Sequence, residues 1–222
     1  FNCPFIWATP DWWDHIRCAE GFFDTLNMLD EPKYGVRFKV EALELEVKKS
    51  YVFPCDEKTN IWMIDRREWQ IGLAAEARDL NVQIHENSPV SKEKLKQLMH
   101  DYDWVIDCSG VPSVTSKAYG FNSFYKNTSG ITVQYTLLGD FSAYYGRIKA
   151  SFEAHYDGYY WVFPKSRNEA NVSLIFFSEN NLKPWDELDW EIEKEGLYAY
   201  TKTRKLGGMC TVVRPEHLVY DK

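Results

Sequence analysis

Several features that define specialised classes of protein are scarce or missing in this chain of 222 residues. No apolar run approaches the roughly 18 to 20 residues of a transmembrane helix, which excludes a membrane-spanning protein. The net charge is −7 and no cluster of Lys and Arg offsets it, so nucleic acid is not an expected partner. The five cysteines are scattered and never spaced as C-x-x-C, which indicates neither a disulfide framework nor a zinc site.

Standard catalytic signatures are missing as well. The chain contains no G-x-G-x-x-G, P-loop, G-x-S-x-G or H-E-x-x-H motif, and its five histidines have no metal-ligand spacing. We therefore expect no metal site, and no catalytic acid or base can be named. The cysteine pattern fits a reducing compartment, so the expected location is cytoplasmic, with at most peripheral contact with a membrane.

Apolar and aromatic residues, in contrast, are abundant. Hydrophobic residues make up 45% of the chain and aromatic residues 16%, including nine Trp. A disordered chain lacks this apolar surface, so the composition predicts a folded, soluble protein. The length allows one sizeable core or two small ones.

The first part of the chain predicts a helix followed by strands. Residues 10–29 have a possible N-cap at Thr9, Pro10 in the first helical position, and apolar residues at spacings of three or four, as in an amphipathic helix. Apolar residues then alternate with charged ones from Val36 to Val47, with a one-residue shift. This pattern predicts two strands or one bulged strand.

The rest of the chain changes from an α/β pattern to a β-rich one. The α/β pattern consists of strands at 62–64, 82–84 and 104–107, a helix between the first two, and a helix that begins at Ser91. The β-rich pattern consists of strands at 131–138, 147–156, 159–163 and 171–177, as in an antiparallel sheet, with one helix at 184–195. The change near residues 110–120 predicts two domains, 1–115 and 116–222.

Two segments have the residue types of a ligand site. The strand that ends in Cys108-Ser109-Gly110 would let a ligand approach the backbone, and Arg66 at a helix start could hold an anion, although an ordinary turn has the same composition. In the second segment, residues 157–165, strand alternation puts Tyr159, Trp161 and Phe163 on one face. The resulting aromatic wall could be core or could line a ligand site.

Taken in order, these segments resemble the geranylgeranyl reductase family, a branch of the FAD-dependent oxidoreductases with the p-hydroxybenzoate hydroxylase-like fold. The family's D-R-x-x-F-D is read here as D-R-R-E-W-Q at 65–70. Its A-D-G or A-T-G strand end, followed by Ser, is read as C-S-G at 108–110 with Ser113. Its Y-x-W-x-F-P is read as Y-Y-W-V-F-P at 159–164, and N-V-S at 171–173 stands where the family has N-V-G.

The resemblance implies a mixed fold, α+β and α/β: a partial FAD-binding layer plus a mostly antiparallel substrate-binding sheet with helices on one face. It also assigns two sets of residues. The FAD contacts would be Arg66, Val90, Ser109 and Gly110. The residues that line the substrate cavity would be Tyr159, Trp161, Phe163 and Pro164.

The function implied is reduction of carbon–carbon double bonds in an isoprenoid lipid of the geranylgeranyl type, with electrons from NAD(P)H or ferredoxin. Two alternatives remain open: an FAD-dependent monooxygenase or halogenase of the same fold, and a non-catalytic domain that binds a lipid or a partner protein. The family's N-terminal G-x-G-x-x-G and downstream G-D-A are not found, and residues 207–221 look like the lead-in to the latter. We therefore expect the chain to be a middle portion of a flavoprotein, and whether this portion alone retains FAD is left open.

Overall fold

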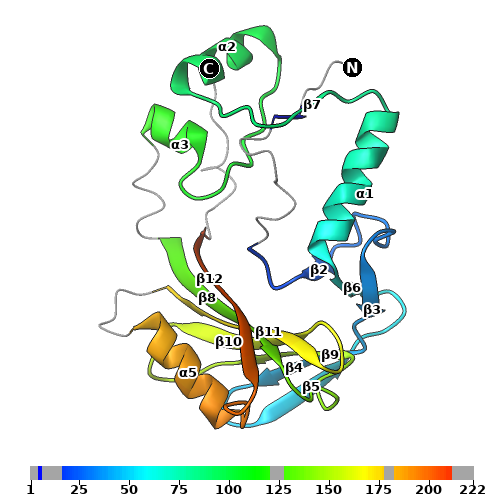
Figure 1. The fold of residues 1–222 in the computed structure, drawn as a ribbon, viewed down its shortest axis with the longest axis vertical. Coiled ribbons are helices and arrows are strands. Elements are labelled where there is room, and N and C mark those ends of the chain that lie inside the picture. Colours follow the sequence, from blue (N-terminus) through cyan, green and yellow to red (C-terminus); the bar gives the residue numbers. More distant parts are fainter. Residues whose placement is uncertain (1–4, 7–16, 121–127, 178–182, 212–222) are drawn as a thin grey trace. The chain divides into compact units, whose positions relative to one another are not determined.

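The computed structural model describes residues 5–6, 17–120, 128–177 and 183–211, and the chain divides into two compact units (Figure 1). Each unit is discontinuous in sequence, whereas the predicted domains, 1–115 and 116–222, are contiguous, and that functional division stays a prediction. The first unit is formed by Phe1–Trp12, Ala77–Gly130 and Met209–Lys222. The second unit is formed by Trp13–Glu76 and Ile131–Gly208.

A seven-stranded sheet dominates the second unit. Its order is β12-β8-β11-β10-β9-β4-β5. The pairs β8–β11, β11–β10, β10–β9 and β4–β5 are antiparallel, and β4–β9 is parallel. The strand bounds are β4 Ala42–Glu46, β5 Ser50–Pro54, β8 Ser129–Leu138, β9 Arg147–Ser151, β10 Gly158–Pro164, β11 Glu169–Phe176 and β12 Thr201–Thr211.

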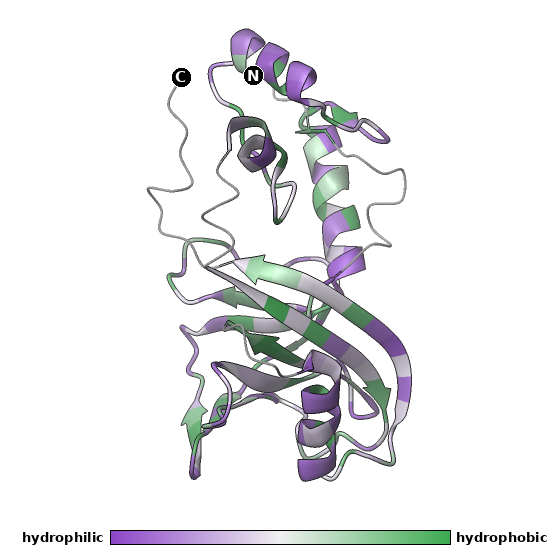
Figure 2. Ribbon diagram, turned by 90° about the vertical axis from the view of Figure 1, so that its left-hand side faces the viewer, coloured by the Kyte–Doolittle hydropathy of each residue, from purple (hydrophilic) through white to green (hydrophobic). Residues whose placement is uncertain are grey.

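Helix α5 (Pro184–Lys194) covers one face of this sheet (Figure 1). Leu188 and Ile192 of the helix pack against inward side chains of the strands, such as Tyr160 and Val162, and all four are almost completely buried. Because the strand period is two, the residues between them point to the opposite face. Figure 2 shows the corresponding changes between hydrophobic and hydrophilic residues along the strands.

A smaller sheet precedes helix α1 (Arg66–Asp79) in the second unit. Its order is β2-β6-β3, with both pairs antiparallel; the bounds are β2 Gly21–Asp24, β3 Val36–Lys39 and β6 Asn60–Ile64. Ile61 and Met63 of β6 pack with Val40 and Ile148 in a second buried cluster. The predicted alternation from Val36 to Val47 is thus two strands, β3 and β4, which belong to different sheets.

The first unit contains short elements. Strands β1 (Phe5–Ile6) and β7 (Ile84–His85) pair in parallel. Helix α2 (Lys92–Asp101) begins after Ser91, whose side chain accepts a hydrogen bond from the Lys94 N–H, so the predicted N-terminus is confirmed. Helix α3 (Val114–Tyr119) was not predicted; it begins after the N-cap Ser113 and ends at Gly120, whose φ of 81° is left-handed.

The helix predicted for residues 10–29 is wrong in its described part. Residues 10–16 lie outside the described residues, and Gly21–Asp24 form strand β2. The apolar spacing matches a helix, but Phe22 packs on Trp69 of α1 and Phe23 packs on Phe163 of β10, which is the two-sided pattern of a strand. Glu20, with φ of 70°, also interrupts any helix there.

The strand predicted for residues 104–107 is not present either. This segment has no strand partner among the described residues, and the side chains of Trp104 and Ile106 are 85% and 84% exposed. An apolar run becomes a strand only where another strand offers hydrogen-bond partners. The prediction was made from the run alone.

The predicted fold class is confirmed: the structure is mixed, with a large and mostly antiparallel sheet and few helices. Four predicted strands of the β-rich part correspond to β8 to β11, and the predicted helix at 184–195 corresponds to α5. No helix in the described ranges has the length and apolar character needed to cross a membrane.

Candidate functional site

A row of five aromatic rings lies on the sheet face that α5 leaves uncovered. Consecutive ring centroids are 5.5, 5.2, 6.2 and 5.8 Å apart. We call this row the aromatic ladder. It consists, in order, of Phe152, Tyr159, Trp161, Phe163 and Phe23. Tyr159, Trp161 and Phe163 are three of the four residues predicted for the substrate cavity, and the predicted alternation places them together.

The fourth predicted residue, Pro164, is not on the ladder. It pairs with Ala170, a fully buried residue of the cluster under α5, so it shares the face of Tyr160 and Val162. The structure adds two rings that the sequence analysis missed. Phe23 was missed because its segment was predicted as a helix, and Phe152 because nothing in its sequence context distinguishes it from a core residue.

Gly21 allows the ladder to reach strand β2. A Cβ atom at position 21 would lie 2.8 Å from the Phe163 ring and 2.5 Å from the Phe23 ring, closer than side chains can pack. Glycine is therefore required here for close packing, and its segment lies directly against the ladder.

A row of buried polar side chains lies beside the ladder on the same face. In the strand register Trp161 is opposite Ser173 and Phe163 is opposite Asn171. Ser173 donates to Gln134 Oε1 at 2.9 Å, and Thr136 donates to Asn171 Oδ1 at 2.8 Å. Buried polar groups on a sheet are costly unless they are paired in this way, and their pairing fixes a defined polar edge along the aromatic wall.

Glu20 connects this polar row to helix α1. Its carboxylate accepts hydrogen bonds from the Asn171 amide at 3.1 Å and from the Arg66 backbone N–H at 3.2 Å. The Lys165 ammonium lies 3.1 Å from the same carboxylate and 3.3 Å from that of Glu169. Glu20 is only 8% exposed and has a left-handed φ, so the surroundings hold it in an unfavourable backbone conformation.

Arg66 begins helix α1 and keeps most of its donors available. Its guanidinium lies over the Trp69 ring at 5.2 Å and contacts the Cys18 Sγ atom at 3.7 Å. Among the described residues no carboxylate pairs with it, because Asp65 is bound to Arg37 at 2.7 Å. A half-buried guanidinium held by a ring and a thiol is suited to an anionic ligand such as a phosphate.

In the first unit, Asp107 organises the predicted Ser109-Gly110 turn. Its carboxylate accepts the Ser109 backbone N–H at 2.9 Å, the Ser109 hydroxyl at 2.5 Å and the Thr115 N–H at 2.7 Å. Ser109 Oγ in turn accepts the Val114 N–H at 2.8 Å, at the start of α3. Gly110 has φ of 94°, and a Cβ there would meet nothing within 4 Å, so the backbone of the turn is open to a ligand.

The same contacts give a pH-dependent prediction. Burial alone would raise the pKa of Asp107, but the hydrogen bonds from Ser109 and Thr115 outweigh it and lower the pKa from 3.8 to about 2. A lowered pKa stabilises the fold above pH 4, and this contribution is lost as the pH falls towards 2. Asp107→Asn should therefore cost about 1 kcal/mol at pH 7, allowing for solvent screening, and much less at pH 2. Urea unfolding at both pH values measures this; an equal cost at both would contradict it.

Val90, the fourth predicted FAD contact, lines a cavity of about 270 Å³ in the first unit. The cavity combines an apolar wall with two cationic side chains. Its lining residues are Val90, Lys92, Val114, Lys117 and Ala118. This composition suits a flat apolar ring joined to an anionic group. The sequence analysis identified neither lysine: Lys117 belongs to α3, which was not predicted, and Lys92 belongs to α2, which was predicted without a ligand role.

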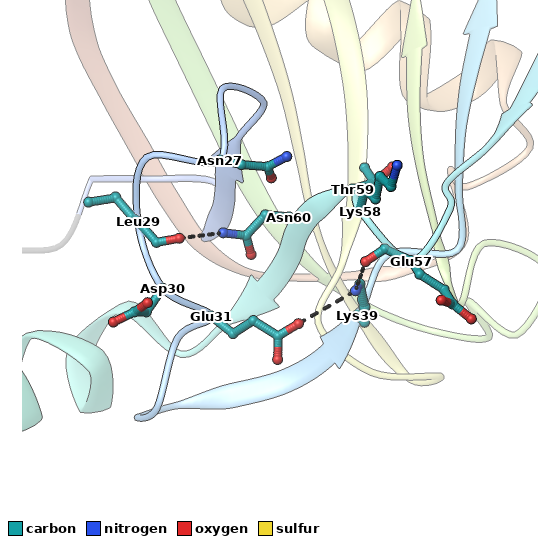
Figure 3. Close-up of a pocket in the computed structure, with 9 residues that line it drawn as sticks. All are labelled: Asn27, Leu29, Asp30, Glu31, Lys39, Glu57, Lys58, Thr59 and Asn60. Carbon is teal, nitrogen blue, oxygen red and sulfur yellow. Dashed lines mark hydrogen bonds and ion pairs between the residues drawn. The ribbon is translucent and has the colours of Figure 1, made fainter.

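A second cavity, of about 250 Å³, lies in the second unit away from every predicted site residue (Figure 3). Its lining residues are Asn27, Leu29, Asp30, Glu31, Lys39, Glu57, Lys58, Thr59 and Asn60. Lys39 is held by the Glu57 carbonyl at 3.2 Å and the Glu31 carboxylate at 3.6 Å. Asn60 donates to the Leu29 carbonyl at 3.1 Å, so two polar side chains of this cavity are engaged by their neighbours, and we assign it no role.

Comparison by sequence identifies no relative: no family model matches the chain, and no curated protein matches it. In the described part of the chain, no group of three or more His, Cys, Asp and Glu residues is placed to hold a metal ion.

Comparison by structure finds solved proteins with a similar fold. A geranylgeranyl bacteriochlorophyll reductase-like protein from Thermoplasma acidophilum superposes with a TM-score of 0.70 at 17% identity, over 96% of this chain and 61% of that one. The flavin-dependent halogenase CmlS gives 0.54 at 15% identity, over 80% and 38%. A flavoprotein/dehydrogenase from Cytophaga hutchinsonii gives 0.54 at 16% identity, over 77% and 49%. The chain thus spans less than two thirds of each of these proteins, and it has the fold of flavin-dependent oxidoreductases and halogenases.

Proposed function

We propose that this chain belongs to an FAD-dependent oxidoreductase that reduces carbon–carbon double bonds of an isoprenoid, geranylgeranyl-type lipid. The observation that carries the proposal is the aromatic ladder beside a row of hydrogen-bonded polar side chains, on the sheet face that α5 leaves uncovered. A row of rings offers an extended apolar chain many contacts without specifying hydrogen bonds. The fold described above supports flavin as the cofactor.

Taken within each unit separately, the residues proposed to hold FAD suit different parts of that group. The guanidinium of Arg66 would bind a phosphate, and the open backbone at Ser109 and Gly110, with the cavity beside Val90, would accept the adenosine part. When bound and reduced, FAD supplies a hydride for the double bond. The ladder's part is to orient the isoprenoid chain and exclude water.

We name no catalytic acid or base on the ladder face. Glu20 is buried there and Lys165 is partly buried, but the two side chains pair with each other, and Glu20 also accepts hydrogen bonds from Asn171 and from the Arg66 backbone. Their role in this proposal is structural. Electrons would come from NAD(P)H or ferredoxin, and the test below replaces both with flavin that is already reduced.

The test uses the full-length protein, with reduced flavin and a geranylgeranyl lipid under anaerobic conditions. Reoxidation of the flavin together with formation of a saturated chain would support the reductase. Substrate-dependent oxygen uptake, or halide incorporation in air, would instead assign the monooxygenase or halogenase chemistry. A full-length protein that purifies without flavin absorbance and takes up none would exclude both and leave a lipid- or partner-binding domain.

A variant pair tests the proposed FAD contact. Arg66→Ala should weaken flavin binding by the full-length protein about 10- to 100-fold, because a hydrogen bond to a charged group contributes about 1.5 to 3 kcal/mol. The neighbouring Arg67→Ala removes an exposed guanidinium that pairs with Glu68, and should change flavin binding little. Flavin fluorescence titration compares the two; equal dissociation constants would remove Arg66 from the proposed site.

A further inference from the structure

The hairpin formed by β4 and β5 is at the edge of the large sheet. Its turn is residues 47–49, closed by a hydrogen bond from the Val47 N–H to the Lys49 carbonyl at 3.2 Å. Strand β5 is the last strand of the sheet order, and all five of its residues are exposed. An exposed and apolar edge strand is unusual in proteins and requires an explanation.

One face of this hairpin is apolar and open to water. Leu45, Val47, Tyr51 and Phe53 are 37%, 58%, 54% and 51% exposed. The strand register places four residues in one row across the sheet. Leu45 of β4 is opposite Tyr51 of β5 on one side and opposite Ala150 of β9 on the other. Ala150 is in turn opposite Trp161 of β10. Residues opposite one another share a face. The apolar face of the hairpin is therefore an outward continuation of the aromatic ladder.

The turn of the hairpin is positively charged. Lys48 and Lys49 are exposed, and neither has a carboxylate partner in the part of the chain that the structure describes. The two glutamates on the other face of the hairpin are already engaged: Glu44 with the Ser50 hydroxyl and Arg147, and Glu46 with Lys149. In a chain with a net charge of −7, the turn is a local cationic site.

We propose that the β4–β5 hairpin docks on the surface of an anionic lipid bilayer. Tyr51, Phe53 and their apolar neighbours would enter the boundary between headgroups and acyl chains, and Lys48 and Lys49 would lie among the lipid phosphates. The benefit of such docking rests on the proposed function, since an isoprenoid lipid would pass from the bilayer along the apolar face to the ladder. The docking surface itself, formed by the apolar face and the two lysines of the hairpin, does not depend on the proposed function.

A second copy of the chain fits the hairpin less well. Pairing along β5 would use the backbone at the edge of the sheet, where Pro54 supplies no N–H. It would also leave Tyr51 and Phe53 in water, because their side chains project from the face of the sheet and not from its edge. A bilayer covers the face and offers phosphates to the lysines, so it accounts for both observations.

The experiment measures cosedimentation of the full chain with vesicles. Vesicles of phosphatidylcholine alone are compared with vesicles of phosphatidylcholine and phosphatidylglycerol in equal parts. The double variant Lys48→Gln, Lys49→Gln should bind the anionic vesicles about 30-fold more weakly than the parent chain, since each lysine near such a surface strengthens binding about fivefold. The matched control is Lys94→Gln, Lys96→Gln, which removes two exposed lysines from α2 and should change binding little.

A second variant tests the apolar face. Tyr51→Thr, Phe53→Thr keeps residues that favour strands and should lower binding to both kinds of vesicle more than tenfold. Tyr198→Thr removes another exposed ring of the second unit and should not. Circular dichroism and thermal unfolding check that each variant folds.

Vesicle binding that is absent, or that neither hairpin variant weakens, would overturn the proposal. So would concentration-dependent self-association, in analytical ultracentrifugation, that the hairpin variants abolish without any vesicle binding. Vesicle binding needs no flavin and no turnover. The two proposals can therefore fail separately: vesicle binding can be found when the reductase assay fails, and reductase activity can be found when vesicle binding is absent.

Discussion

Replacing Glu20 by alanine is expected to lower the free energy of unfolding by about 3 kcal/mol, among the largest effects of any single substitution in this chain. The change removes the acceptor of the Arg66 backbone N–H, one of the two acceptors of the Asn171 amide, and one of the two carboxylates that compensate the partly buried Lys165. Buried donors that lose their acceptor are not resolvated by water, so the full cost appears in the folded state. Urea unfolding followed by tryptophan fluorescence measures it.

Two control variants separate the causes. Glu169→Gln neutralises the more exposed partner of Lys165 and should cost less than about 1 kcal/mol. Glu20→Gly also removes the carboxylate, but glycine accepts the left-handed φ of 70° without strain, so it should be about 1 kcal/mol more stable than Glu20→Ala. A Glu20→Ala protein as stable as the parent chain would show that the ion pair and its hydrogen bonds contribute nothing net.

Gly158→Ala is expected to destabilise the large sheet by about 3 kcal/mol. The added Cβ would lie 1.8 Å from the Ile175 carbonyl oxygen, an atom of the neighbouring backbone that cannot rotate away. Strands β10 and β11 would have to separate at the end where Gly158 is opposite Phe176, next to the ladder residue Tyr159. Thermal unfolding should show the loss directly.

The matched control is Gly208→Ala in strand β12. A Cβ at position 208 meets nothing within 4 Å, so this substitution should change stability by less than about 0.5 kcal/mol. The pair compares the same chemical change in two strands of one sheet. If both variants unfolded at the same temperature, the close approach at Gly158 would not be a real constraint.

The sequence predicts elements well where one local pattern decides the structure. The alternation of residues 159–163 predicts both the strand and its two faces, because a single residue's shift would expose the buried set that packs on α5. The Ser91 cap likewise predicts where α2 begins. In each case the responsible contacts lie within a few residues or follow from a strict period.

Local patterns mislead where distant partners decide. Residues 21–24 have helical spacing, but hydrogen bonds from β6, about 40 residues later, make them a strand. Residues 104–107 have the composition of a strand, but no described strand pairs with them. Tertiary context overrides propensity in both segments.

Only part of the candidate site could be predicted from the sequence. The three rings of β10 follow from their alternation, and Arg66 follows from the resemblance. Glu20 lies far in sequence from Lys165 and Asn171 of the β10–β11 hairpin, and no spacing in the sequence indicates that it meets them. Phe23 joins the ladder only because β2 crosses the large sheet's ladder face at Gly21.

The parallel pairing of β4 with β9 has a consequence for synthesis of the chain. Ala42 is paired with Arg147, so the hairpin leaves the ribosome about 100 residues before the strand that fixes its inner edge. At typical elongation rates that interval is about 5 to 20 s. For this time both edges of an apolar hairpin are unpaired, so the nascent chain should be a chaperone substrate from residue 54 until β9 emerges.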